Sequence, residues 1–143
     1  MTVRLCFASL LVAVLILSLL GCNGDPVGRT VPVKGTVKLD GQPLKQGSLV
    51  FWPDAAKGNS LAVEAAAQIS AEGTYELITR GKPGAPPGAY KVTVMAQVPI
   101  NPKDPYSKAK LLVPTEYTTK ETTPLQIEVV DNPAPGAYDL PVK

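Results

Sequence analysis

The sequence predicts an all-β protein, a sandwich of seven short strands that follows an N-terminal export signal. Three observations support this fold class. Apolar and polar residues alternate with a period of two through most of residues 31–143, which is typical of half-buried strands. The chain has 12 glycines and 15 prolines, more than average usage, and they separate the alternating stretches as turn residues do. No stretch after residue 30 shows a convincing helical period.

The first four strands are expected over 31–39, 48–52, 61–69 and 75–79. In the first, valine or leucine recurs at alternate positions, and Asp40-Gly41 then supplies a hairpin turn. The second is apolar on both faces, as a central strand would be. The third is rich in alanine and could be read as helix, but it keeps period two between turn residues, so we expect a strand. The fourth places Tyr75, Leu77 and Thr79 on one face.

The last three strands are expected over 90–98, 125–129 and 138–142. The first of these has the clearest alternation in the chain, and Pro99 ends it. Residues 80–88 precede it with three prolines and three glycines, so we expect a loop there. Residues 99–124 form a long, proline-rich excursion for a small sandwich, and such loops are often functional or disordered. Seven short strands at turn spacing indicate a β-sandwich.

Residues 1–21 have a different composition from the rest of the chain. Arg4 is their only charged residue, and Leu5 to Leu20 is an unbroken run of apolar and small residues. A short positive start followed by an apolar segment and a small residue is typical of a secretory signal peptide. The alternative is a transmembrane anchor, but the run is shorter than the roughly 20 residues that span a bilayer. We therefore expect an exported protein.

The end of this segment, Leu19-Leu20-Gly21-Cys22, resembles the lipobox of bacterial lipoproteins. The resemblance implies cleavage before Cys22, a diacylglycerol thioether on that cysteine and acylation of the new amino terminus. The alternative is ordinary cleavage nearby that leaves a free thiol. Residues 22–30 are expected to be a tether, and Asn23 after the cysteine permits sorting to an outer membrane by analogy with enteric lipoproteins.

Three local motifs occur in order along the expected strands. They are Gly35-Thr36-Val37 followed by Asp40-Gly41-Gln42-Pro43-Leu44, then Ala71-Glu72-Gly73-Thr74-Tyr75-Glu76-Leu77, then Pro87-Gly88-Ala89-Tyr90-Lys91-Val92-Thr93-Val94. This order resembles the carboxypeptidase regulatory-like domain, a transthyretin-like fold, with Glu72 where aspartate is usual. The resemblance implies a seven-stranded Ig-like or prealbumin-like sandwich over 31–143. It also implies a small bacterial lipoprotein with one such domain.

Composition excludes several function classes. The chain has no histidine, so catalysis or metal binding that depends on histidine is excluded. One branch of the transthyretin-like group hydrolyses 5-hydroxyisourate and uses histidines and a C-terminal Tyr-Arg-Gly-Ser. This chain has no histidine and ends Asp-Leu-Pro-Val-Lys, so that activity is excluded. The net charge of +2 gives no electrostatic footprint for nucleic acid. Cys6 is removed with the signal peptide and Cys22 is lipidated, so the domain keeps no thiol for a disulfide or a metal.

Other constellations have plain structural explanations. Glu64 and Glu76 fall on outward strand positions and are expected to be solvated charges rather than a catalytic pair. Lys34 and Lys38 alternate with buried valines, so they are expected to face water and not to form an internal isopeptide bond. The aspartates are scattered without a calcium-loop pattern. We expect no catalytic residue, cofactor or metal.

The functional prediction is a non-catalytic lipoprotein of the bacterial envelope, anchored to a membrane through Cys22, that acts as a structural or protein-interaction module at an outer membrane or cell surface. The alternative is a ligand-binding accessory domain with a glycan as its ligand. Its candidate contacts are the aromatic residues Trp52, Tyr106 and Tyr117. The alternative requires segment 99–124 to present the two tyrosines beside Trp52.

Overall fold

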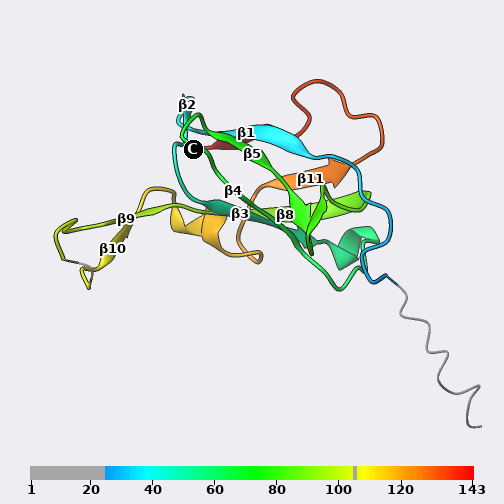
Figure 1. Ribbon diagram of the computed structural model, residues 1–143, viewed down its shortest axis with the longest axis horizontal. Helices are drawn as coiled ribbons and strands as arrows, with labels where there is room; N and C mark the ends of the chain where they lie inside the picture. The colour runs from blue at the N-terminus through cyan, green and yellow to red at the C-terminus, as the bar shows by residue number, and fades with distance from the viewer. Residues whose placement is uncertain (1–24, 105) are drawn as a thin grey trace, which may run out of the picture.

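A computed structural model describes residues 25–104 and 106–143 and consists mainly of strands. Figure 1 shows them as open sheets with little helix. In the described residues the helical elements are two short 3₁₀ turns, η1 (Ala55–Lys57) and η2 (Thr115–Thr118). The all-β class is therefore confirmed. The predicted signal peptide and Cys22 lie outside the described residues.

The first sheet is built on β1, near the start of the domain. Its strands are β1 (Lys34–Leu39), β2 (Gln42–Pro43), β5 (Thr74–Glu76) and β12 (Leu140–Val142). β12 pairs with β1 in parallel, with Val37 opposite Leu140, whereas β2 and β5 pair with β1 antiparallel. The two ends of the domain thus meet side by side in one sheet.

The second sheet has six strands in the order β11-β8-β3-β4-β6-β7. Their bounds are β3 (Ser48–Pro53), β4 (Ala65–Gln68), β6 (Ile78–Thr79), β7 (Lys82–Pro83), β8 (Gly88–Met95) and β11 (Gln126–Val129). β3 pairs with a neighbour on each side, as its two apolar faces predicted. The alanine-rich segment forms β4 and not a helix.

The two sheets share one hydrophobic core. The Phe51 ring on β3 lies 6.2 Å from the Tyr75 ring of the first sheet and 5.9 Å from the Tyr90 ring on β8, measured between centroids. Phe51 is fully buried, and so are Val33 and Val37 on the facing side. Burying a side chain of this size stabilises the fold by about 1.5–3 kcal/mol, so this contact layer joins the sheets.

A third, two-stranded sheet lies outside this core. β9 (Gln97–Pro99) pairs only with β10 (Ala109–Leu111), and the hairpin projects from one end of the molecule in Figure 1. The sequence predicted one continuous strand over 90–98. The structure instead interrupts it at Ala96, which is fully buried, and Val98 pairs with Lys110 away from the second sheet.

Two further differences concern the segment around Leu77. Tyr75, Leu77 and Thr79 are all buried, as their shared face predicted. However, the predicted strand divides between the sheets, because β5 pairs with β1 and β6 pairs with β4. The predicted loop 80–88 contains β7, which forms a tight hairpin with β6 through a turn where Arg80 has a φ of 47°.

Candidate functional site

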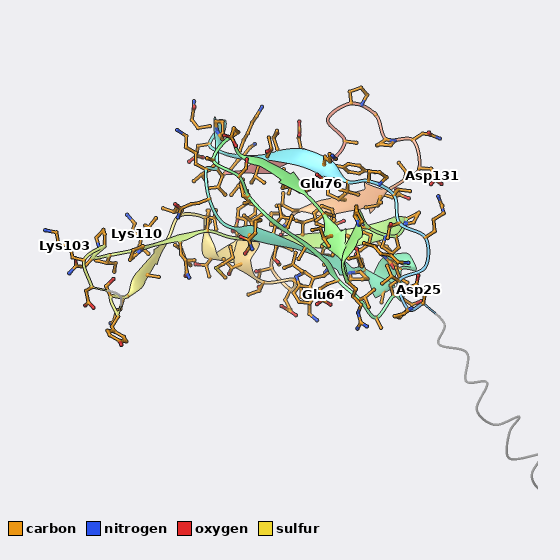
Figure 2. All side chains as sticks on the ribbon, in the orientation of Figure 1. Asp25, Glu64, Glu76, Lys103, Lys110 and Asp131 are labelled. Carbon is orange, nitrogen blue, oxygen red and sulfur yellow. The ribbon has the colours of Figure 1, made fainter. Side chains whose placement is uncertain are left out.

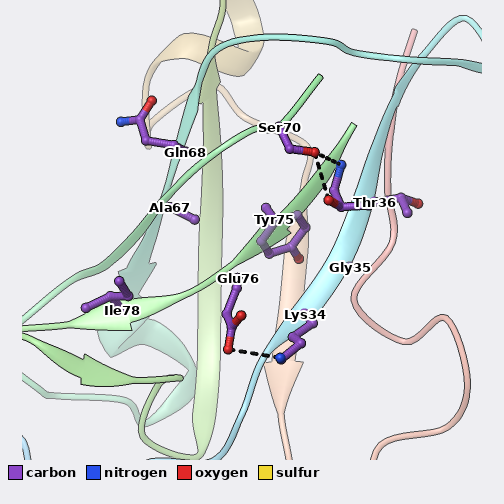
Figure 3. A pocket seen from close by; sticks show the side chains of 10 residues that line it. Lys34, Gly35, Thr36, Ala67, Gln68, Ser70, Tyr75, Glu76 and Ile78 are labelled. Carbon is purple, nitrogen blue, oxygen red and sulfur yellow. Dashed lines mark hydrogen bonds and ion pairs between the residues drawn. The ribbon is translucent and has the colours of Figure 1, made fainter. Parts of the chain in front are cut away.

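A hollow on the surface lies where β5 and β4 separate. We call it the inter-sheet groove, a space of about 700 Å³ whose walls include Gly35, Ala67, Gln68, Tyr75, Glu76 and Ile78. Figure 3 shows the residues that line it, which come from β1, β4, β5, β6 and the segment between β4 and β5. The groove exists because the chain crosses from one sheet to the other at Leu77, which leaves an edge of β5 unpaired.

Backbone groups supply part of the groove's polarity. The β1–β5 ladder includes bonds from the Val37 N–H to the Gly73 carbonyl and from the Leu77 N–H to the Val33 carbonyl. Residues of an antiparallel strand alternate between bonding to this neighbour and facing away. The N–H and C=O of Glu76 therefore face the groove. One end is narrowed by the Ser70 hydroxyl, which lies 2.8 Å from the Thr74 hydroxyl.

The ionisable groups Lys34, Glu76 and Tyr75 of the groove form an ion pair or a hydrogen bond within the protein. Lys34 Nζ lies 3.1 Å from Glu76 Oε1, and both side chains are more than half exposed. The Tyr75 hydroxyl donates a 2.6 Å hydrogen bond to the Tyr138 carbonyl oxygen, and burial raises the pKa of this phenol far above its usual value. The groove can therefore bind a ligand through hydrogen bonds and apolar contacts, but its lining offers no activated nucleophile or base.

A second notable region is the start of the described chain. Residues 25–30, which we call the strap, lie against the domain. Val27 is only 4% exposed, the Arg29 guanidinium pairs with the Asp131 carboxylate, and the Lys82 ammonium pairs with Asp25. These cations lower the pKa values of Asp25 and Asp131. The described part of the tether predicted over 22–30 is thus docked on the domain, and residues 22–24 lie outside the described residues.

The three candidate aromatic residues do not form a common surface. Trp52 is half-buried, donates a 3.0 Å hydrogen bond to the Thr93 hydroxyl, and has the Lys120 ammonium 5.6 Å from its ring centroid. Tyr117 is 5% exposed, and its hydroxyl accepts a 3.3 Å hydrogen bond from the Lys143 N–H. Tyr106 is 94% exposed in the β9–β10 hairpin. The burial of Tyr117 removes it from any ligand platform.

Most of the other predicted positions are found where the sequence placed them. Glu76, Lys34 and Lys38 are exposed on their strands, and Glu64 is exposed just before β4 begins, not in a strand as predicted. Figure 2 labels Glu64 and Glu76 well apart in the molecule, so they do not form a carboxylate pair. Within 25–104 and 106–143, no three metal-ligating side chains come together. In the same described part of the chain, no helix has the length and apolar character to cross a membrane.

Comparisons of the chain with models of protein families, with curated proteins and with solved structures found no match. The resemblance to the carboxypeptidase regulatory-like domain therefore stays a prediction that depends on the motifs themselves. Sequence reasoning missed two features of the site, the docked strap and the projecting hairpin. A valine at position 27 within a polar segment was the available signal for the strap.

Proposed function

We propose that this protein is an exported, non-catalytic lipoprotein of the bacterial envelope. In this proposal, lipid on Cys22 anchors it to a membrane, and Asn23 after that cysteine permits sorting to an outer membrane or the cell surface. Its domain is a seven-stranded Ig-like or prealbumin-like sandwich of the carboxypeptidase regulatory-like kind. The domain serves as an interaction module for a protein partner in the envelope.

Three structural details support the finer fold assignment. The two sheets pack over one core, and the first and last strands pair in parallel. The Tyr90 hydroxyl, near the start of β8, donates a 2.8 Å hydrogen bond to the carbonyl of Pro86, four residues upstream. A tyrosine that bonds back to the preceding backbone in this way is typical of Ig-like sandwiches, where it fixes the corner before a strand.

The observation that carries the functional proposal is the short distance along the chain between the lipobox cysteine and the docked strap. The strap begins at Asp25, three residues after Cys22. An extended chain spans at most about 3.6 Å per residue, so roughly 10 Å of chain would separate the lipid from the domain. Each buried methylene of an acyl chain contributes about 0.8 kcal/mol to anchoring. A domain attached so closely would stay at the membrane surface.

The groove chemistry supports a non-catalytic role. Lys34 and Glu76 neutralise each other, and the Tyr75 phenol is held by its hydrogen bond to the Tyr138 carbonyl. A glycan-binding role receives less support, since Tyr117 is buried and the Trp52 ring is partly covered by Lys120. An interaction module requires neither a reactive group nor an aromatic platform.

The test is a pair of cysteine variants expressed in a bacterium and labelled with a fatty-acid analogue. Cys22→Ala should abolish labelling and release the protein from membranes, because Cys22 is the expected site of the lipid. Cys6→Ala is the matched control and should keep both properties, since that residue is expected to leave with the signal peptide. Membrane association that persists in unlabelled Cys22→Ala protein would overturn the proposal. Separation of the two membranes then tests the sorting prediction.

A further inference from the structure

The β9–β10 hairpin lies at the end of the molecule opposite the strap. We call residues 97–104 and 106–111 the arm. Figure 2 places Lys103 and Lys110 of the arm at one end of the long axis, and Asp25 and Asp131 of the strap region toward the other. If the chain is anchored as proposed above, the arm therefore points away from the membrane.

The arm has a defined shape although it makes little contact with the core. Val98 pairs with Lys110, and the Ile100 N–H donates a 2.8 Å hydrogen bond to the Lys108 carbonyl. At the base, the Gln46 side-chain amide donates a 2.8 Å hydrogen bond to the Gln97 carbonyl. An ordered hairpin presents its side chains with a smaller entropic cost on binding than a flexible loop does.

The arm leaves both apolar and charged side chains exposed to water. Tyr106 is 94% exposed and Ile100 is 66% exposed, so their apolar area is left in water. Lys103, Lys108 and Lys110 are exposed, and none of them belongs to the three ion pairs found in the described chain. Asp104 is the arm's only acidic residue. The surface therefore combines an aromatic side chain with unpaired positive charge.

We propose that the arm is the surface through which this protein binds its partner, and that the partner is a protein with an acidic surface around an apolar recess. Tyr106 fills the recess, because exposed aromatic side chains are the usual anchors of protein interfaces. The three lysines pair with the surrounding carboxylates and accelerate encounter. Only the arm's direction relative to the membrane rests on the anchor. The binding itself does not.

The partner contacts the side chains of the arm and does not add a strand to the hairpin. Lysine and proline on an edge strand are typical devices against strand addition. Lys110 lies in β10 and Pro99 lies in β9, so each edge of the hairpin carries one of them. Recognition therefore depends on charge and on the tyrosine, and both can be changed without disturbing the sheets.

The experiment measures binding of the mature lipidated chain, in nanodiscs of zwitterionic lipid, to a synthetic peptide of alternating glutamate and leucine. The triple variant Lys103→Glu, Lys108→Glu and Lys110→Glu should weaken binding by about tenfold or more at low salt, since it reverses every arm lysine. Tyr106→Ala should weaken binding by about tenfold. The matched control reverses three exposed lysines elsewhere, Lys38, Lys45 and Lys143, and should stay within about twofold of the wild type.

Each other outcome overturns the proposal. Equal weakening by the two triple variants would show a general charge effect. An unchanged affinity in Tyr106→Ala would show that Tyr106 does not contact the partner. No binding by the wild type would show that the arm does not recognise an acidic partner. Tighter binding to phosphatidylglycerol vesicles or to polygalacturonate than to the peptide would assign the arm to a lipid surface or an anionic glycan. Repeating the measurement with Cys22→Ala separates this result from the anchor, because peptide binding should persist without lipid.

Discussion

The strap and the arm are two polar segments outside the main sheets, yet they differ in how closely they contact the domain. The strap buries Val27 to 4% exposure and forms two ion pairs with the domain. The arm leaves Tyr106 94% exposed, and its two strands pair with each other in a sheet of their own. Both contain proline and charged residues, so composition does not separate them. What separates them is whether the segment itself is fixed to the domain by a buried side chain and ion pairs.

The strap leads directly into the shared core. Val31, just after it, forms a two-way backbone bridge with Ala85, with bonds of 2.9 and 3.0 Å, and β1 begins three residues later. The arm instead follows the interruption at Ala96, where pairing with the second sheet has ended. Local stability follows such connections, because segments that share core contacts unfold together and segments that lack them open separately.

The largest expected effect is at the bridge that holds the end of the strap. Gly84 has a φ of +86°, and a Cβ there would lie 1.9 Å from the Val31 carbonyl oxygen. Gly84→Ala should therefore lower the free energy of unfolding by about 3 kcal/mol, because the bridge must move and the backbone is strained. Urea denaturation of the mature protein measures this.

Gly81→Ala is the matched control for this substitution. Its φ is +84°, but no atom lies within 4 Å of the added Cβ, so only the backbone strain of about 1 kcal/mol is expected. Equal decreases in the free energy of unfolding of the two variants would show that the close approach of residue 84 to Val31 does not affect stability. The docking of the strap would then depend on its side chains alone.

The second effect concerns the buried side chain of the strap. Val27→Ala should cost about 2 kcal/mol, the transfer free energy of the removed methyl groups plus a small cavity term. The corresponding change in the arm, Val98→Ala, should cost about 0.5 kcal/mol or less, because Val98 is only partly buried and lies outside the shared core. Thermal denaturation of both variants measures the difference. A Val98→Ala loss as large as that of Val27→Ala would mean that the arm is part of the cooperative unit.

The third effect is a pH dependence of strap docking. The pKa of Asp25 is lowered, chiefly by its bond to Lys82, and the pKa of Asp131 is lowered by Arg29. A carboxyl with a lowered folded-state pKa stabilises the fold above its unfolded value of about 3.9, and this contribution is lost as the pH falls through the folded value. The effect should be small because both pairs are exposed.

The amide of Val27 reports this titration, since its N–H donates a 3.1 Å hydrogen bond to Asp25 Oδ1. Its ¹⁵N chemical shift should change with a midpoint below 3.9, and Lys82→Met should move the midpoint upward toward the ordinary aspartate value. A wild-type midpoint at or above 3.9 would contradict the ion pair.

The alternation of residues could predict which side chains are buried. Val63, Ala65, Ala67 and Ile69 are all buried, as period two required, because the pleat of a strand is a local property. The change of sheet at Leu77 could not be predicted. It depends on which strands lie on either side, and the residue pattern of the segment does not indicate which strands will pair with it.

Parts of the site could not be predicted from the sequence because they depend on contacts between residues that are far apart along the chain. Gly35 belongs to a recognisable motif, but what requires glycine there is the Tyr138 carbonyl oxygen, 2.2 Å from where a Cβ would lie. Tyr117 is similarly buried beside the C-terminal residue Lys143, whose N–H bonds to its hydroxyl. In both cases the deciding partner is distant in sequence, so local spacing carries no information about it.

The smallest expected effect on stability is also the one that most sharpens the contrast between strap and arm. Tyr106→Ala should change the free energy of unfolding by less than about 0.5 kcal/mol, since a 94% exposed side chain has almost no folded-state contact to lose. The arm amides should exchange with solvent through local opening, before global unfolding and faster than the strap amides. A stability loss above about 1 kcal/mol would show that Tyr106 packs on the domain in solution. A loss below about 0.5 kcal/mol would mean that Tyr106 is not required for folding, as the binding role proposed for the arm needs.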